Sequence, residues 1–380
     1  MFDFASALYL GLRHPSTQTG RYDALTTGTP AALAVAPLAN ALTPRVARLQ
    51  GCEAAMLAPS TLHLAIDTFD RLARTHALIA DEALYPVMRW GLERAMGMGV
   101  PVAWFHHGDA FDVARRIRRR QRRKPPAIIA DATCIEGTPT PVTAYLELAR
   151  TQGGLIVLDQ SQVLGLLGEH PSTTCPWGHG GGGVLPYMGI APREPVLLLS
   201  SWAKAFGAPL ATLGGPAELV NAVARDGPTQ THCSAASQSA MQAAMNALAI
   251  NERAGERLRA TLHQRLTRLE QGLRWLARTS LPDLHTLRRH HPLQQIRLGS
   301  GERTMALYTG LRLRGFRTAL LHPAGNGYAV AVVVRADHGA SAIDALVGAM
   351  AAVAPRLPPA AFTVLNAPTA IEEDEHVHDL

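Results

Sequence analysis

Lys204 lies just after an expected buried strand, a position in which a lysine amine could act as a nucleophile. The apolar run Val196 to Leu199 predicts a buried strand. Lys204 follows its end, just before Gly207 and Pro209, where the chain must turn. The ordinary interpretation is a solvent-facing loop lysine, because lysine is rarely buried without a partner. The alternative is an amine desolvated enough to be neutral and to form a Schiff base with a carbonyl cofactor.

A second short apolar run ends in a carboxylate. Residues Leu155 to Leu158 predict another buried strand, and Asp159 follows them directly. A pyridoxal 5'-phosphate (PLP) site needs a lysine to hold the aldehyde and a carboxylate to keep the pyridine nitrogen protonated. Lys204 and Asp159 together therefore favour the Schiff-base interpretation, with a solvated loop at Asp159 as the alternative.

The lysine motif carries a resemblance to a known family. Ser201-Trp-Ala-Lys204-Ala-Phe-Gly207 is similar to the lysine motif of the α-oxoamine synthases, which are fold-type I PLP-dependent transferases. Looser matches extend from Tyr9 to His338. The resemblance implies that Lys204 carries the cofactor and that Ser201 contacts its phosphate.

The resemblance also assigns residues around the cofactor ring. Asp159 would pair with the pyridine nitrogen, and Gln162 replaces the family histidine at the ring hydroxyl. A glutamine amide can donate a hydrogen bond there but cannot titrate. Tyr85 stands where the family has a ring-stacking histidine, and an aromatic face can stack as well. A buried Tyr85 on a core helix is the alternative. Cys134 replaces a serine near the ring and could equally be a small buried residue.

Two further hydroxyl positions would reach the cofactor phosphate. Ser60, Thr61 and Leu62 open an expected helix whose backbone N–H groups would suit a phosphate. Ser234 matches a family hydroxyl that reaches the phosphate of the partner subunit, which implies a homodimer. For Ser60 or Thr61 a plain helix N-cap is a further interpretation that does not exclude phosphate binding, and for Ser234 an N-cap is the alternative.

The main departure from the family lies near the C-terminus. Ala329 and Ala331 occupy the positions of a family Arg-x-Arg whose first arginine holds the substrate carboxylate. Either another cation, such as Arg335 or Arg13, takes that role, or the substrate is not a standard α-amino acid.

The surrounding pattern predicts the elements that position these residues. Apolar runs at 77–80, 100–105, 127–130, 155–158 and 196–199 alternate with helical segments at 84–97, 109–121 and 142–151. This alternation predicts an α/β fold, a mostly parallel sheet flanked by helices, with ligands at the carboxyl ends of the strands. The resemblance implies that this region is the large domain of a fold-type I, aspartate aminotransferase-like enzyme. We expect an N-terminal arm (1–45), a large PLP-binding domain (46–235), a long connecting helix (236–282), a small C-terminal α+β domain (283–360) and an acidic, disordered tail (361–380).

Composition excludes several other classes of protein. The four cysteines lack CxxC spacing, so neither a zinc site nor a disulfide framework is expected. No secretory signal or membrane-length apolar run is evident, which predicts a cytoplasmic protein. The basic run Arg115 to Lys124 is interpreted as a charged helix face. It lacks the interleaved aromatic residues that nucleic-acid binding would favour.

These observations predict a homodimeric PLP-dependent acyltransferase. The resemblance implies condensation of an amino acid or related amine with an acyl thioester of coenzyme A or a carrier protein, through a Lys204 aldimine. An aminotransferase, racemase or C–C lyase on the same fold stays open. So does a non-catalytic protein that binds an acidic partner through Arg115 to Lys124.

Overall fold

The computed structural model describes residues 1–20, 22–119, 124–133, 140–286, 290–322 and 327–359. Its centre is a seven-stranded sheet with the order β2-β8-β7-β6-β5-β3-β4. The strands are β2 (Ala54–Ala58), β3 (Ala77–Asp81), β4 (Val102–Phe105), β5 (Pro126–Asp131), β6 (Leu155–Asp159), β7 (Val196–Ser201) and β8 (Ala211–Gly215). Strands β4, β3, β5, β6 and β7 are mutually parallel, and β8 is antiparallel to both of its neighbours. The predicted mostly parallel sheet is confirmed.

Helices cover both faces of this sheet because successive strand residues point to opposite sides. Ile128 and Ile156 face one apolar cluster, whereas Ile129 and Val157 face another. On the second face lie α2 (Thr61–Thr75), α3 (Pro86–Gly97) and α7 (Ala217–Asp226). The first face is covered by α1 (Pro37–Gln50), α4 (Ala110–Arg119), α5 (Val142–Arg150) and α6 (Val184–Met188). Such two-sided burial explains why these strands read as continuous apolar runs.

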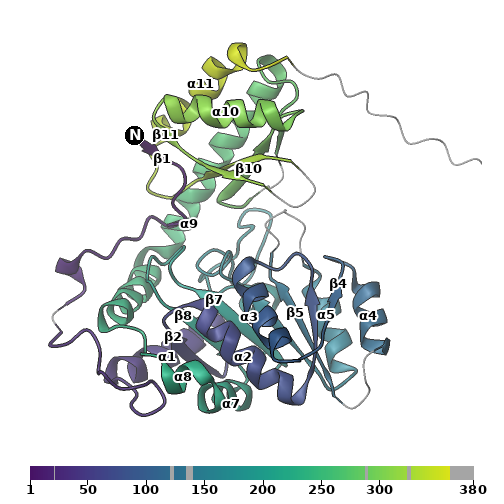
Figure 1. Cartoon of the computed structure of the whole chain (residues 1–380). Coiled ribbons are helices and arrows are strands. Elements are labelled where there is room, and N and C mark those ends of the chain that lie inside the picture. Colours follow the sequence, from purple (N-terminus) through teal and green to yellow (C-terminus); the bar gives the residue numbers. More distant parts are fainter. Residues whose placement is uncertain (21, 120–123, 134–139, 287–289, 323–326, 360–380) are drawn as a thin grey trace, which may run out of the picture.

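A long helix joins the large sheet to a smaller unit. Helix α9 (Gln238–Thr279) follows the short α8 (Pro228–His232) and rises from beside the large sheet into the upper part of the molecule (Figure 1). There, four strands pair in the order β12-β13-β10-β9: β9 (His285–Thr286), β10 (Leu293–Arg297), β12 (Ala319–Leu321) and β13 (Ala329–Val333). Helices α10 (Gly301–Leu313) and α11 (Ala340–Val353) and the 3-10 turn η2 (Ala354–Arg356) complete it. The expected helix–strand content of this region is confirmed.

The N-terminal segment reaches across the molecule. Strand β1 (Phe2–Asp3) pairs in parallel with β11 (Phe316–Arg317) of the small unit. Farther along, after the 3-10 turn η1 (Ser16–Gln18), the chain enters α1 at Pro37. The prediction of an arm up to residue 45 was therefore wrong for its last residues. Pro37 sits in the first turn, where its missing N–H costs nothing, and the inner Pro44 hid the helical pattern.

Three sequence predictions fall wholly or partly on residues outside the described ranges. Cys134 and the acidic tail lie outside them, and so do residues 120–123 of the basic run. Within the described residues, no helix is long and apolar enough to cross a membrane.

Candidate active site

The lysine loop is built on buried aromatic side chains. After β7, Trp202 and Phe206 are both almost fully buried, with ring centroids 4.7 Å apart. The backbone N–H of Ala208 donates to the Trp202 carbonyl at 3.0 Å, which closes a tight loop around Lys204. Gly207 ends the loop at a φ of +62°, where a Cβ would lie 2.5 Å from the carbonyl oxygen of Leu12. The loop can therefore hold Lys204 in a fixed place.

A buried polar network anchors the loop from below. The Trp202 indole N–H donates to the Thr212 hydroxyl oxygen at 3.0 Å, and the Gln50 amide donates to the same oxygen at 3.1 Å. Gln160 donates to the Ser200 hydroxyl at 3.0 Å. Thr212, Gln50, Gln160 and Ser200 are each fully buried. Their mutual hydrogen bonds offset the cost of burying polar groups beneath the lysine.

The environment of Lys204 favours a reactive amine. Burial lowers its pKa below the usual value for lysine, although the nearby carboxylates of Asp159 and Asp131 act in the opposite direction. Its Nζ lies 5.5 Å from the centre of the Tyr85 ring. Of the 36 lysines and arginines in the sequence, only Lys124 and Lys204 are lysines. The guanidinium of arginine stays protonated and does not form a Schiff base, so the presence of a lysine at this partly buried position is chemically significant.

Two carboxylates share the cavity with the amine. Asp131 and Asp159 are directly paired residues at the carboxyl ends of β5 and β6, and both are buried. Asp159 Oδ1 accepts the backbone N–H of Ser161 at 2.8 Å, and Asp131 Oδ2 accepts that of Tyr85 at 2.9 Å. The cavity is lined by Tyr85, Asp131, Thr133, Asp159, Ser161, Gln162 and Lys204. The structure therefore brings four predicted residues together: Lys204, Asp159, Gln162 and Tyr85.

Sequence reasoning missed three residues of this cavity. Asp131 ends its strand as Asp159 does, which was a visible signal, because parallel strand ends meet at one edge of the sheet. Ser161 links the ends of β6 and β7, because its hydroxyl accepts the backbone N–H of Ser201 at 2.8 Å. Thr133 has no hydrogen bond to the described residues, and no sequence pattern pointed to it.

Tyr85 is not a buried residue on a core-facing helix. It precedes α3, whose first residue is Pro86, and its side chain is 36% exposed. The alternative of a buried core tyrosine is therefore wrong. Its ring lies beside the Lys204 amine at the edge of the cavity, where it could stack on a bound cofactor.

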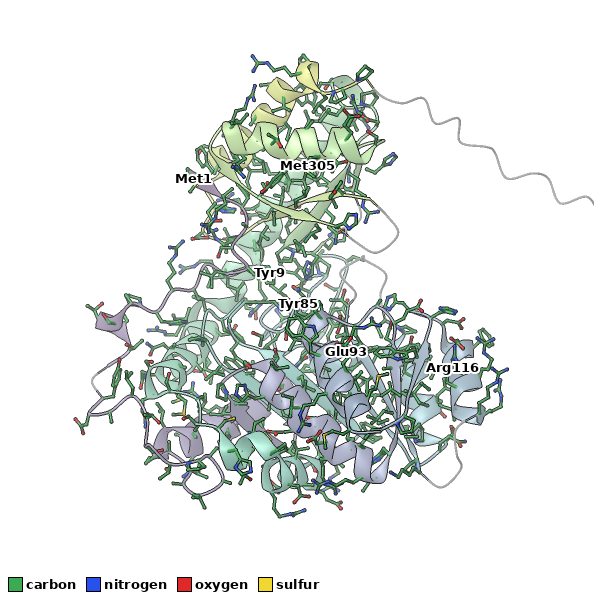
Figure 2. All side chains as sticks on the ribbon, in the orientation of Figure 1. Met1, Tyr9, Tyr85, Glu93, Arg116 and Met305 are labelled. Carbon is green, nitrogen blue, oxygen red and sulfur yellow. The ribbon has the colours of Figure 1, made fainter. Side chains whose placement is uncertain are left out.

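Gln162 is held by residues from outside the large sheet. Its Oε1 accepts a short hydrogen bond from the Tyr9 hydroxyl, and the His291 ring contacts its backbone carbonyl at 3.1 Å. Tyr9 and Tyr85 both lie at the junction between the small unit and the large sheet (Figure 2). The end of the glutamine side chain is thus fixed beside the cavity.

The expected phosphate contacts occupy the ends of two elements. Ser60 precedes α2, which packs on β7 and β8, but its hydroxyl contacts His63 Nδ1 at 2.8 Å rather than capping the helix. The N-cap interpretation of Ser60 is therefore wrong for its side chain. Thr61 and Leu62 form the first turn, where backbone N–H groups lack helical acceptors. The Ser201 hydroxyl has no hydrogen-bond partner among the described residues.

Ser234 is exposed, and it lies three residues before the N-cap of α9 instead of at the N-cap itself. Ser237 caps α9, because its hydroxyl accepts the Ala240 N–H at 3.2 Å. Ser234 instead forms an isolated bridge with Pro30. The N-cap alternative for Ser234 is wrong, and its role towards a partner subunit stays a prediction.

No guanidinium occupies the family position on β13. Ala329 and Ala331 are buried in that strand. Arg335 is also buried, and it donates to Asp337 at 2.8 Å and to the Asp3 carbonyl at 2.9 Å. Arg13 is exposed and forms an ion pair with Asp337 at 3.3 Å. Of the two candidate cations, Arg13 is the one exposed to solvent, whereas Arg335 is held by buried contacts.

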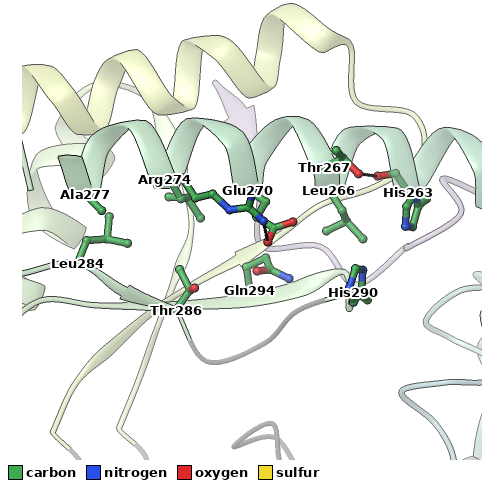
Figure 3. Close-up of a pocket in the computed structure, with 11 residues that line it drawn as sticks. His263, Leu266, Thr267, Glu270, Arg274, Ala277, Leu284, Thr286, His290 and Gln294 are labelled. Carbon is green, nitrogen blue, oxygen red and sulfur yellow. Dashed lines mark hydrogen bonds and ion pairs between the residues drawn. The ribbon is translucent and has the colours of Figure 1, made fainter. Parts of the chain in front are cut away.

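Another hollow lies within the small unit. It runs between α9 and the strands β9 and β10, and its lining includes His263, Glu270, Arg274 and His290 (Figure 3). Arg274 pairs with Glu270 at 2.6 Å, and none of the predicted site residues that the structure describes lines this hollow. Among the described residues, no group of histidine, cysteine and acidic side chains could hold a metal ion.

The residues that line the cavity at the sheet edge have the chemistry that PLP requires. It combines a partly desolvated amine with a buried carboxylate that can pair with a pyridinium nitrogen. Gln162 Nε2 has no hydrogen-bond partner among the described residues, which leaves a donor for the ring hydroxyl. The unpartnered Ser201 hydroxyl adds a donor at the end of β7.

Comparisons with known proteins agree with this chemistry. Residues 36–320 match the aminotransferase class I and II family. An 8-amino-7-oxononanoate synthase of Halorhodospira halophila is 26% identical over 328 residues, covering 85% of this chain and 76% of the relative. A Sphingomonas wittichii serine palmitoyltransferase has a TM-score of 0.80 at 16% identity, covering 94% of this chain and 88% of the other. The S. paucimobilis serine palmitoyltransferase with a bound PLP–myriocin adduct has a TM-score of 0.79 at 13% identity, covering 93% and 87%.

These comparisons confirm the predicted fold class, the resemblance to the α-oxoamine synthases and PLP as the cofactor. The match covers most of the chain, including β7 and the lysine loop. This chain therefore belongs to the aminotransferase class I and II family of PLP-dependent enzymes.

Proposed function

We propose that this protein joins an amino acid, or a related amine, to an acyl thioester. The observation that carries the proposal is the shared cavity of Lys204 and Asp159 at the carboxyl edge of the sheet. When bound, PLP supplies an electron sink for the bond that breaks at the substrate α-carbon. The α-carbon–hydrogen bond breaks and its proton passes to the Lys204 amine. The new carbon–carbon bond joins that α-carbon to the acyl carbonyl, and the carbon–sulfur bond breaks to release a thiolate that takes up a proton and leaves as the thiol.

Each residue has a defined part in this proposal. Lys204 holds the cofactor through its lowered-pKa amine and later moves protons at the α-carbon. Asp159 keeps a proton on the ring nitrogen. Tyr85 stacks on the ring, and Gln162 donates to the ring hydroxyl. Because glutamine does not titrate, proton transfer falls to Lys204.

Contacts with the cofactor phosphate complete the proposed site. The α2 N-terminus at Ser60, Thr61 and Leu62, with the Ser201 hydroxyl, would bind it. Ser234 of a second subunit would add a hydroxyl, which is why we propose a homodimer. We place the protein in the cytoplasm. The acyl group would arrive on coenzyme A or on a carrier protein.

The competing interpretations differ in what they release. An aminotransferase would convert the amino donor to an oxo acid, a racemase would invert it, and a lyase would split it without an acyl donor. The non-catalytic alternative requires free basic side chains between Arg115 and Lys124. Two of them, Arg115 and Arg116, already pair with Asp112 at 2.7 and 3.2 Å. This pairing weakens that alternative.

A substrate matrix tests the proposal. The PLP-loaded protein is incubated with amino acids and with acyl-coenzyme A or acyl-carrier thioesters, and thiol release is measured with product mass. We expect thiol release that requires both substrates and is lost in Lys204→Ala but not in Lys124→Ala. Oxo-acid formation, racemisation or cleavage without thioester would refute acyl transfer, as would no reaction with any pair.

A further inference from the structure

Gln162 can face the cavity with either end of its amide, and the choice decides its chemistry. With the nitrogen inward it donates hydrogen bonds, and with the oxygen inward it only accepts. The Asp131 and Asp159 carboxylates line the same cavity. An inward oxygen would face these negative charges, whereas an inward NH₂ group is attracted by them. The cavity therefore favours the nitrogen inward.

Tyr9 fixes that orientation from the other side. Its hydroxyl donates to Gln162 Oε1, so the amide oxygen is already engaged and the nitrogen is the end of the amide that is left to donate. Tyr9 is 1% exposed. The Ala336 backbone N–H donates to its carbonyl at 2.8 Å, and its ring packs edge-on against His291 at 5.7 Å. The tyrosine is thus a rigid hydrogen-bond donor.

His291 holds the backbone of the same glutamine. The Leu293 N–H donates to His291 Nδ1 at 3.1 Å, so that nitrogen is an acceptor and a neutral ring carries its proton on Nε2. Nε2 then donates to the Gln162 carbonyl at 3.1 Å. Both the main chain and the side chain of Gln162 are therefore positioned by the N-terminal segment and the small unit.

We propose that Tyr9 is a positioning residue that orients the Gln162 amide as a hydrogen-bond donor to the cofactor ring hydroxyl. Tyr9 does not touch the reacting atoms in this account; it acts through Gln162. The inference rests on the proposed role of Gln162. It assigns to Tyr9 the orientation that lets the glutamine amide, which does not titrate, take the place of the family histidine.

The proton shared by the Lys204 nitrogen and the cofactor ring oxygen reports on this contact. A donor to the ring oxygen stabilises its anionic form and weakens its hold on the shared proton, so the pKa of the cofactor band falls. Without an oriented donor, that pKa rises. The absorbance change of the bound cofactor with pH measures it directly, without turnover.

The test is a double-mutant cycle on the PLP-loaded protein, with Tyr9→Phe, Gln162→Ala and both together. We expect Tyr9→Phe to raise the pKa of the band by about half a unit to one unit, and Gln162→Ala by about one unit or more. In the Gln162→Ala background, Tyr9→Phe should add nothing, because its effect passes through the glutamine. Tyr308→Phe, on α10, is the matched control and should leave the pKa unchanged.

Two results would overturn the proposal. An unchanged pKa of the cofactor band in Tyr9→Phe would show that Tyr9 has no positioning role. If Tyr9→Phe shifts that pKa equally in the wild-type and the Gln162→Ala backgrounds, Tyr9 acts by a route other than Gln162. Gln162→Glu covers the case in which Tyr9→Phe does not fold. Its ionised carboxylate can still accept from Tyr9 but cannot donate, so the pKa should rise, and no rise would refute the account. A wild-type protein without any cofactor band would instead contradict the proposed function.

Discussion

Replacing Thr212 by valine tests the buried network beneath the lysine loop. Valine keeps the shape of threonine but removes the hydroxyl that accepts from Trp202 and from Gln50. No cavity is created, so the result reports on hydrogen bonding and not on lost packing. Thr212 lies on β8, outside the cavity that would hold the cofactor.

The structure sets the size of the effect. The Trp202 indole N–H is fully buried and has no other acceptor among the described residues, so its desolvation is left uncompensated. Among the residues that the structure describes, the Gln50 amide N–H keeps only a long 3.4 Å contact with the Ser200 hydroxyl. A buried donor left unpaired costs about 1–3 kcal/mol. Because one donor is stranded and a second is weakened, we expect Thr212→Val to lower the free energy of unfolding by about 2–4 kcal/mol.

Urea unfolding of the cofactor-free protein, followed by tryptophan fluorescence, measures this change. Thr212→Ser is the matched control, because it keeps the hydroxyl and loses one buried methyl group, which costs about 1 kcal/mol. A Thr212→Val protein as stable as the wild type, or more stable than Thr212→Ser, would refute the reasoning. A weakened loop should also reduce PLP affinity in Thr212→Val more than in Thr212→Ser.

Two further predictions concern carboxylates. Asp159→Asn removes the charge expected to hold the pyridinium proton, so PLP affinity should fall at least about tenfold, the equivalent of one pKa unit. The control variant Glu82→Gln, changed at an exposed residue of the same sheet edge, should bind PLP normally in the same titration. Normal PLP binding by Asp159→Asn would contradict the assignment. Burial alone would raise the pKa of Asp112, but hydrogen bonds from the His106 N–H, Arg115 and Arg116 outweigh it and lower the pKa to about 2. The stability from Asp112 is therefore fully present above its unfolded-state pKa of about 4 and is lost as the pH falls towards 2. Between about pH 4 and about pH 2, the free energy of unfolding should therefore change less with pH in Asp112→Asn than in the wild type. An identical pH dependence in the two proteins would contradict this role of Asp112.

The sequence predicted the residues whose chemistry is local to a strand end. Lys204 and Asp159 follow buried apolar runs, and parallel strands bring such ends to one edge of the sheet. Tyr85 and Gln162 were found through the family motif, and the structure places both at the same cavity. The four residues meet at one cavity because parallel strands end at the same edge of the sheet, while their roles towards a cofactor stay predictions.

Contacts between distant segments could not be predicted in this way. Tyr9 meets Gln162 only because the N-terminal segment crosses from β1 to the lysine loop, where the His14 ring contacts the Phe206 carbonyl at 2.8 Å. Tyr9 precedes Gln162 by about 150 positions, and no local pattern encodes such a contact. The antiparallel strand β8 was also missed, because its Ala and Gly residues carry weak strand preference.

The most direct test of the central claim is to identify the residue that carries the cofactor. The purified protein is loaded with PLP, reduced with borohydride, digested and analysed by mass spectrometry. The sequence contains only Lys124 and Lys204 as side-chain amines, so the outcome is unambiguous. The account predicts a pyridoxyl group on Lys204 and none on the exposed Lys124, with the absorbance band lost in Lys204→Ala. Labelling at Lys124 alone, or a band that persists in Lys204→Ala, would contradict it.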